Sequence, residues 1–303
     1  MKVIKISLRF LLLLTSIAIL SKLWIKNTSS FRVDKINPKN FFTNHFDVKL
    51  LDDENLDPIF NQNYKFLAKG RQSFVFVSAD DKYVIKFFRF HRYRLPLFCS
   101  FIKFIPLGNR YSQNLQNEID DCYLKTMNSY KLVYERLKDQ TATIYVHLNK
   151  TKNLNKKLKI TDKFKNSYVL DLDSMGFVVQ KKAQSFEKAL LDAKSDETRL
   201  NSLITAFFDN LDYMYSQNII NKDRHVLQNL GVIDNSKVVE IDIGRLCKKN
   251  NFNKEKVKKE ALHYTTYLKK WIAKNVPDAL FIVEDQLNKL LQTKDAIDEK
   301  KIH

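Results

Sequence analysis

The chain has 303 residues, enough for two lobes or one large domain, and its hydrophobic content of 44% supports a packed core and excludes wholesale disorder. The formal net charge of +18 suggests anionic partners such as phosphates, acidic lipids or nucleic acids, although lysine and asparagine are abundant throughout and explain the charge without any partner. Three scattered cysteines without a CxxC pair argue against a disulfide framework or a zinc site and favour a reducing compartment.

The N-terminal residues 1–26 combine positive charges with an apolar core, Phe10–Leu20. This core is shorter than the about 20 residues of a spanning helix and is typical of a signal peptide, yet no small-x-small cleavage site follows. We predict a targeting or anchor segment outside the fold that associates the protein with a membrane, with a buried core helix as the alternative. Residues 27–60 are polar and irregular and are expected to be a linker.

The sequence leaves two alternatives for the side of the membrane on which the body of the protein lies. Positive residues ahead of an apolar segment favour a body on the outer side, where ATP is scarce. The segment therefore lies along the inner face, or the protein is secreted or delivered into a host cell.

A β-rich region follows. Residues 64–78 and 82–88 form three runs joined by a glycine turn at Gly70 and an Asp-Asp turn at Asp80, and Lys86 lies in the third run. On this pattern alone, the region is a set of hairpins with an exposed lysine.

Residues 87–110 interleave aromatic and basic side chains, and no acid occurs between Asp81 and Glu118. Pro96 and Pro106 argue against one continuous helix. The composition suits an anionic membrane surface, and it equally suits stacking on single-stranded nucleic acid. A clamp packed across the β-rich region is the alternative that needs no partner.

The remaining elements are read from the spacing of apolar residues. Helices are predicted over 113–137, 196–216, 253–274 and 278–293, the last opened by Pro277. Strands are predicted over 141–148, 167–172 and 176–180, which would complete a five- or six-stranded antiparallel sheet.

Two carboxylates and one carboxamide fall at neighbouring strand ends. Asp223 lies in a polar loop, Asn229 opens a short apolar run six places later, and a turn leads to a second run that ends at Asp242. Such hard oxygen ligands suit Mg²⁺ on phosphates. A hairpin with ordinary surface carboxylates is the alternative.

In their order along the chain, these motifs resemble those of the protein-kinase-like superfamily, and above all its small bacterial enzymes that act on small molecules or lipopolysaccharide core sugars. The residues that carry the resemblance are Gly70, Lys86, Asp223, Asn229, Asp242 and Gly244. It covers about residues 62–293 and implies an α+β, bilobal kinase-like fold. The expected domains are an antiparallel β N-lobe over 61–183, with 87–110 as an insertion, and a shortened, mostly helical C-lobe over 184–303.

The sequence departs from the family pattern at several points. Gln72 and Val75 replace two loop glycines, no His-Arg pair precedes Asp223, and the gap from Asp223 to Asn229 is one residue too long. An extra extended residue shifts the chain by about 3.3 Å, so it must be looped out if Asp223 is to act as the base. No Ala-Pro-Glu element follows Gly244.

The resemblance also implies roles. Asp223 would accept the proton of a substrate hydroxyl, and Asn229 and Asp242 would hold Mg²⁺ on ATP. Lys86 would grip the α- and β-phosphates, oriented by Glu118 or, less preferred, Glu135. Further nucleotide contacts are expected at Gly70, Ser73, Phe74, Gln180 and Lys182.

The function implied is transfer of the ATP γ-phosphate to a hydroxyl of a small molecule, lipid, sugar or protein by a monomer. One alternative is a pseudokinase or phosphate-binding scaffold, which the departures favour. The other is a basic nucleic-acid-binding module that uses residues 87–110, and we do not prefer it.

Overall fold

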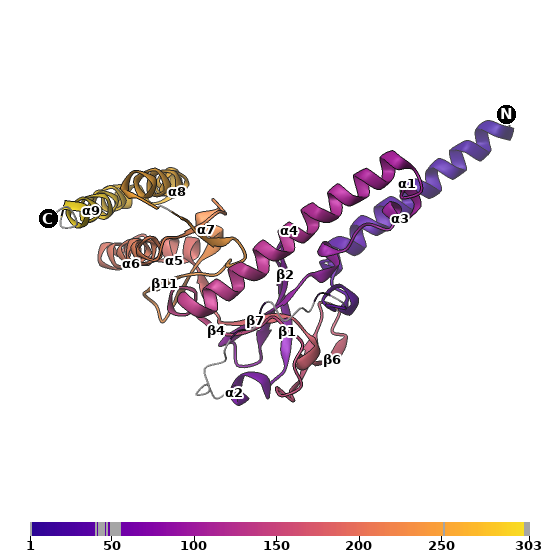
Figure 1. Cartoon of the computed structure of the whole chain (residues 1–303), viewed down its shortest axis with the longest axis horizontal. Helices are drawn as coiled ribbons and strands as arrows, with labels where there is room; N and C mark the ends of the chain where they lie inside the picture. Colours follow the sequence, from indigo (N-terminus) through magenta and orange to yellow (C-terminus); the bar gives the residue numbers. More distant parts are fainter. Residues whose placement is uncertain are drawn as a thin grey trace. The chain divides into compact units, whose positions relative to one another are not determined.

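The computed structural model describes residues 2–39, 41, 46, 48, 56–250 and 252–299, so the predicted linker over 27–60 lies partly outside the described residues. The chain divides into two compact units (Figure 1). Unit 1 comprises residues 1–44, 51–94 and 149–177, and unit 2 comprises residues 45–50, 95–148 and 178–303. The fold is α+β, with a β-rich first unit and a mostly helical second unit, as the protein-kinase-like resemblance implies.

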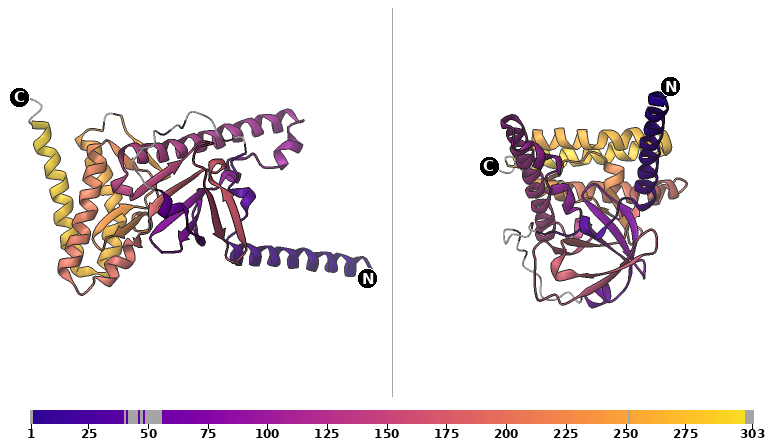
Figure 2. Two further views of the ribbon diagram at one scale, coloured as in Figure 1. Left: turned by 90° about the horizontal axis from the view of Figure 1, so that it is seen from below. Right: turned by 90° about the vertical axis from the view of Figure 1, so that its right-hand side faces the viewer.

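Unit 1 begins with helix α1 (Lys2–Thr28), which extends away from the strands of this unit (Figure 2). The window Leu11–Thr28 is long and apolar enough to cross a membrane, because it continues through Leu23, Trp24 and Ile25 beyond the predicted apolar core. Residues 11–27 are all exposed. Near its C-terminal end, the Trp24 ring stacks on Phe164 with 5.9 Å between ring centroids.

Five strands of a seven-stranded sheet belong to unit 1, in the order β3-β2-β1-β5-β6. Their bounds are β1 (Tyr64–Lys69), β2 (Ser73–Ser78), β3 (Tyr83–Phe88), β5 (Lys157–Thr161) and β6 (Ser167–Asp171). Neighbours are antiparallel, as predicted, except that β1 and β5 run parallel, so the sheet is mixed. Strand β5, whose lysines alternate with the buried Leu158 and Ile160, was not predicted from the sequence.

Short elements complete unit 1: η1 (Val33–Lys35), α2 (Asp57–Phe60), η3 (Phe90–Tyr93) and η5 (Leu172–Ser174). Phe87, Phe88, Phe90 and Tyr93 are all buried. A Cβ on Gly176 would lie 2.6 Å from the Phe90 ring, so only glycine allows this ring to pack here. The first part of the predicted surface over 87–110 is therefore core.

Unit 2 holds the remaining elements. The helices are α3 (Phe98–Ile102), α4 (Pro106–Arg136), η4 (Asp139–Thr141), α5 (Phe186–Asp192), α6 (Glu197–Ser216), α7 (Val226–Asn229), α8 (Lys254–Asn275), η6 (Pro277–Ala279) and α9 (Leu280–Glu299). The strands are β4 (Thr143–His147), β7 (Phe177–Lys181, which begins at the last residue of unit 1), β8 (Gln184–Ser185), β9 (Ile219–Asn221), β10 (Leu230–Ile233), β11 (Lys237–Glu240) and β12 (Leu246–Lys248).

Helix α4 belongs to unit 2, although the prediction placed it in the N-lobe, because it packs against β4 and β12. It starts at Pro106, earlier than expected, since proline fits the first helical turn. Helices α6, α8 and α9 pack against one another (Figure 1). Beside them lie a three-stranded sheet, β11-β10-β8, and a two-stranded sheet, β12-β9.

Candidate functional site

The loop that carries Asp223 is held by a short strand pair. Strand β9 pairs antiparallel with β12, so that Asn221 lies opposite Leu246. The Asn221 carboxamide oxygen accepts the backbone N–H of Asp223 at 2.9 Å, which closes a tight turn directly after the strand. Asp223 therefore follows a fixed strand end.

Asn229 and Asp242 lie side by side at the open end of the β10–β11 hairpin. The two strands are antiparallel, with Leu230 opposite Glu240. One residue further out, the Asn229 carbonyl accepts the backbone N–H groups of Ile241 at 2.6 Å and Asp242 at 3.3 Å. The predicted hairpin is confirmed, and it brings the carboxamide and the carboxylate to the same end.

The extra residue between Asp223 and Asn229 is taken up by a single helical turn, α7. A helix advances about 1.5 Å per residue, against about 3.3 Å in an extended chain, so the turn shortens the path. The Asn229 carboxamide N–H lies within hydrogen-bonding distance, 3.4 Å, of the Asp223 carbonyl. The helical turn thus keeps the two residues close together despite the long spacing, which is the condition for Asp223 to act as the base.

Asp223 is positioned by two basic neighbours. Its Oδ1 accepts from the His225 ring Nδ1 at 2.8 Å and from the His225 backbone at 3.1 Å, and its Oδ2 lies 3.5 Å from the Arg245 guanidinium. Burial raises the pKa of Asp223, but the hydrogen bonds from His225 and Asn229 and the charge of Arg245 outweigh it and lower the pKa overall. The side chain is 16% exposed and is ionised at neutral pH.

A fully buried glutamate, Glu240, lies beneath this cluster. Its carboxyl group accepts from Asn221 Nδ2 at 3.0 Å and from the Tyr264 hydroxyl on α8 at 2.8 Å. Burial, with smaller contributions from the charges of Asp242 and Asp223, raises the pKa of Glu240 to about 8 against the lowering effect of those two hydrogen bonds. Glu240 was not among the predicted site residues; its only signal in the sequence is that it is a lone acid within an apolar, β-branched run.

Two more contacts fix the loops. Arg224 forms an ion pair with Glu260 of α8 at 2.7 Å, and the Ser129 hydroxyl of α4 donates to the carbonyl of Ile243. The loop of Asp223 is therefore held by α8, and the turn after Asp242 is held by α4.

The donor set fits Mg²⁺ bound together with phosphate. In the described part of the chain, no group of three or more His, Cys, Asp or Glu residues gathers to hold a metal. The Asp242 carboxylate is exposed, and Asn229, 4% exposed, adds a carboxamide next to it. Mg²⁺ commonly takes only one or two protein carboxylates and completes its shell with water and phosphate oxygens.

In unit 1, the predicted nucleotide loop is a tight turn in which the Gly70 N–H donates to the Ser73 carbonyl at 2.9 Å. The Arg89 guanidinium binds the carbonyls of Gly70 at 2.8 Å and Arg71 at 3.1 Å and lies 5.1 Å from the centre of the Phe74 ring. Phe74, one of the predicted nucleotide contacts, is fully buried and is therefore a core residue. The contact of Arg89 with this loop was not predicted from the sequence.

Lys86 is half-buried in the centre of β3, opposite Val75 of β2. Lys86 belongs to unit 1, and Asp223, Asn229 and Asp242 belong to unit 2. The convergence of these two sets around one nucleotide therefore stays a prediction.

The other predicted nucleotide contacts lie in unit 2. Glu118 and Glu135 are both exposed on α4, and Glu135 lies 3.9 Å from Lys131. The Gln180 carboxamide is buried and donates to the Thr141 carbonyl at 2.7 Å, so its side chain supports β7, and Lys182 is half-buried. The pairing of either glutamate with Lys86 also stays a prediction.

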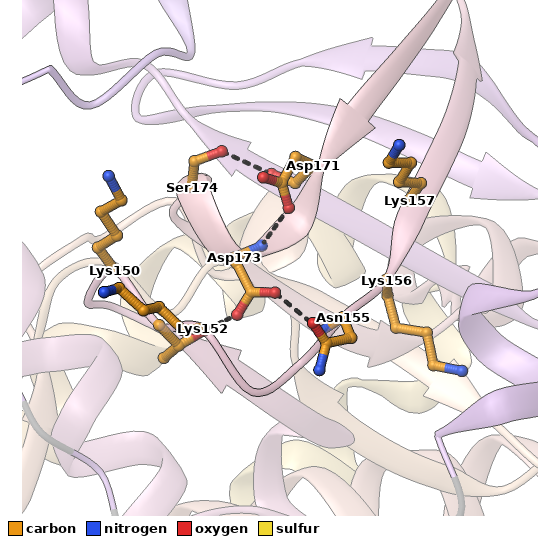
Figure 3. Close-up of a pocket in the computed structure, with 9 residues that line it drawn as sticks. Lys150, Lys152, Asn155, Lys156, Lys157, Asp171, Asp173 and Ser174 are labelled. Atoms are coloured by element: carbon orange, nitrogen blue, oxygen red, sulfur yellow. Dashed lines mark hydrogen bonds between the residues drawn. The ribbon is translucent and has the colours of Figure 1, made fainter.

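A cationic pocket of about 400 Å³ lies in unit 1 between the loop before β5 and η5 (Figure 3). It is lined by Lys150, Thr151, Lys152, Asn155, Lys156, Lys157, Asp171, Asp173 and Ser174. The Asp173 carboxylate holds the loop by accepting from the Thr151 hydroxyl and from the backbone N–H groups of Leu154 at 3.1 Å and Asn155 at 2.8 Å. With four lysines against two carboxylates in its lining, the pocket suits an anionic ligand.

No protein-family model matches the sequence, and no curated protein matches it. Among solved structures, the chain is similar to a crystal structure of WbdD at 16% identity and a TM-score of 0.37, over 76% of this chain and 46% of that one. It is also similar to the bifunctional kinase-methyltransferase WbdD at 17% identity and a TM-score of 0.36, over 75% and 43% of the two chains. A co-crystal structure of WbdD with the kinase inhibitor LY294002 matches at 15% identity and a TM-score of 0.36, over 76% and 45%.

The chain thus spans less than half the length of these solved chains. The functional assignment rests on the geometry of its own residues.

Proposed function

We propose that the protein is an ATP-dependent phosphotransferase that moves the γ-phosphoryl group to a hydroxyl of a small molecule, sugar, lipid or protein. The observation that carries this proposal is the gathering of Asp223, Asn229 and Asp242 at one end of the β10–β11 hairpin. In chain order these are a carboxylate, a carboxamide and a second carboxylate, and, held by backbone hydrogen bonds, they form a set that can orient a hydroxyl and hold a metal–phosphate group.

The reaction exchanges one oxygen–phosphorus bond for another. The acceptor oxygen forms a bond to the γ-phosphorus, the bond from that phosphorus to the β–γ bridging oxygen breaks, and ADP leaves. The proton of the acceptor hydroxyl passes to Asp223. Because the pKa of Asp223 is lowered, this carboxylate is a weak base, and its main work is to accept a hydrogen bond from the hydroxyl and orient it.

The surrounding residues keep that carboxylate in place. His225 and Arg245 fix its two oxygens, and the Asn221 turn fixes its backbone. Asn229 and Asp242 would hold Mg²⁺, which when bound neutralises charge on the phosphates. Lys86 would add a positive charge, and a close contact of this kind amounts to about 4 kcal/mol at an effective dielectric near 20.

A second candidate function is nucleotide binding without transfer. Both carboxylate oxygens of Asp223 already have basic partners, and two carbonyls of the loop after Gly70 already bind Arg89. The contacts of Asp223 leave the base less available to a substrate, which favours a scaffold role.

The test is transfer of label from γ-labelled ATP with Mg²⁺ by the full-length protein, with sugar, lipid and protein acceptors. Asp223→Asn keeps the shape of the side chain and is expected to lower transfer about 10²- to 10⁴-fold while nucleotide still stabilises the protein against heat. Asp242→Asn is expected to abolish the Mg²⁺-dependent part of that stabilisation.

The matched control is Asp234→Asn, the same change at the opposite end of the same hairpin, where Asp234 pairs only loosely with Lys181 at 3.7 Å. This variant should retain transfer. Equal transfer by wild type and Asp223→Asn would refute the catalytic assignment, and nucleotide-dependent stabilisation without any transfer would establish the scaffold.

A further inference from the structure

The segment that links unit 1 to the long helix α4 forms a rigid corner, which we call the α3–α4 corner (residues 97–111). Helix α3 packs against α4, and Cys99 and Ser112 are buried. A Cβ on Gly108 would lie 2.1 Å from the Ile102 carbonyl, so only glycine lets the first turn of α4 approach the end of α3 this closely. The corner is therefore a closely packed junction of two helices, from which the outer side chains project.

Large apolar side chains cover the outside of this corner. Four of them are exposed by more than three quarters: Leu97 84%, Phe101 78%, Phe104 90% and Leu107 78%. Three more are exposed by half or more: Phe98 50%, Ile105 59% and Tyr111 51%. Seven neighbouring apolar side chains on one corner exceed the scattered apolar exposure that is normal on a soluble surface, and they mark an interaction site.

The charge of the corner has one sign. Its charged residues, Lys103 and Arg110, are both basic and both exposed, and the first acid along α4 is Glu118. At about 1.5 Å per residue, Glu118 lies roughly 12 Å further along the helix than Arg110. An apolar tip with basic flanks and distant acids complements an anionic lipid surface, in which rings enter the headgroup level and cations meet phosphates.

The ratio of basic to apolar side chains at the corner favours a membrane over a nucleic acid as its partner. Binding to nucleic acid is dominated by cations on phosphates, and this corner carries two cations against seven apolar side chains. The aromatic residues of 87–93 that could have stacked on bases are buried in unit 1, and Arg89 is buried with them.

A second segment of the chain independently points to a lipid environment. Helix α1 contains a window, Leu11–Thr28, that is long and apolar enough to span a membrane, and its residues 11–27 are exposed. We propose that the α3–α4 corner inserts its exposed apolar side chains into the headgroup layer of an anionic bilayer, as a contact additional to the N-terminal helix. The proposal concerns unit 2 and does not depend on phosphotransfer.

The test places a fluorescent label at the tip of the corner in the full-length protein, reconstituted into nanodiscs of phosphatidylcholine with or without 30% phosphatidylserine. The variant Phe104→Cys is labelled in a background with Cys122→Ser and Cys247→Ser, since Cys99 is buried. The matched control is Tyr267→Cys on α8, another exposed aromatic position of unit 2. Leu97→Cys is a second tip position in case labelling at 104 disturbs folding.

Lipids that carry a nitroxide near the headgroup are expected to quench the label at residue 104, and aqueous iodide is expected to quench the label at residue 267. Quenching by lipid at residue 104 should be stronger in discs with phosphatidylserine, because each basic residue favours the anionic surface by roughly fivefold. Equal quenching by iodide at the two positions would overturn the proposal. Protection of the label at residue 104 from both quenchers would also overturn it, because a protein would then cover the corner. Equal quenching by lipid in discs with and without phosphatidylserine would overturn the role of anionic lipid.

Discussion

The buried Glu240 predicts an unusual dependence of stability on pH. This carboxyl group has no exposed surface, and its pKa is raised to about 8 from the ordinary value of 4.5, first by burial and then by the charges of Asp242 and Asp223. Between these two pH values the folded state keeps a proton that the unfolded chain has lost. Stability contributed by the proton is therefore fully present below pH 4.5 and is lost as the pH rises to about 8.

The magnitude follows from linkage. When the folded state holds one proton more than the unfolded chain, the free energy of unfolding falls by about 1.4 kcal/mol for each unit by which the pH rises. This gives a loss of stability of about 3 kcal/mol between pH 5.5 and pH 7.5. Replacing Glu240 with glutamine removes this loss. The glutamine fits because the Tyr264 hydroxyl, which now donates to Glu240 at 2.8 Å, can rotate its hydrogen and accept from the new amide.

The assay is urea unfolding of the full-length protein in detergent, followed by the fluorescence of Trp271 on α8, from pH 5.5 to pH 7.5. Subtracting the free energy of unfolding of Glu240→Gln from that of the wild type at each pH cancels the contributions of the other titrating groups. The control is Glu135→Gln, at an exposed position on α4, which should keep the slope of the wild type. Parallel curves for wild type and Glu240→Gln would refute the reasoning, because they would mean that Glu240 binds no extra proton in the folded state.

Two further variants test the supports of the site. Gly231→Ala should destabilise the protein by about 1–3 kcal/mol in thermal or urea unfolding, because the added Cβ would lie 2.5 Å from the Ala183 side chain; a stability equal to wild type would contradict this close packing. Arg89→Lys should cost about 1–3 kcal/mol, because lysine keeps the charge but cannot bridge the carbonyls of Gly70 and Arg71 as the guanidinium does; unchanged hydrogen exchange at Phe74 would show that the loop does not need the bridge.

Local sequence patterns were sufficient for the long elements and for the hairpin. The apolar face over 196–216 predicted α6 (Glu197–Ser216), and the pattern over 253–274 predicted α8 (Lys254–Asn275). The run from Asn229 to Asp242 predicted the β10–β11 hairpin and its two oxygen-bearing ends. These signals are local, because helical periodicity and turn chemistry depend on residues a few places apart.

The supports of the candidate site were not visible in the sequence. Glu240 meets Tyr264 across 24 positions, and the carbonyl of Ile243 meets Ser129 across 114. Only the folded chain brings such residues together, and no spacing rule links them. The same holds for α7, whose single turn reconciles the long gap between Asp223 and Asn229.

The sequence by itself determined that residues 87–110 are aromatic, basic and free of acids. The tertiary structure decided that Phe87, Phe88 and Phe90 are core and that Phe101 and Phe104 face outward. The reason is that a phenylalanine is buried only where other parts of the chain come to cover it, and composition does not encode which part arrives.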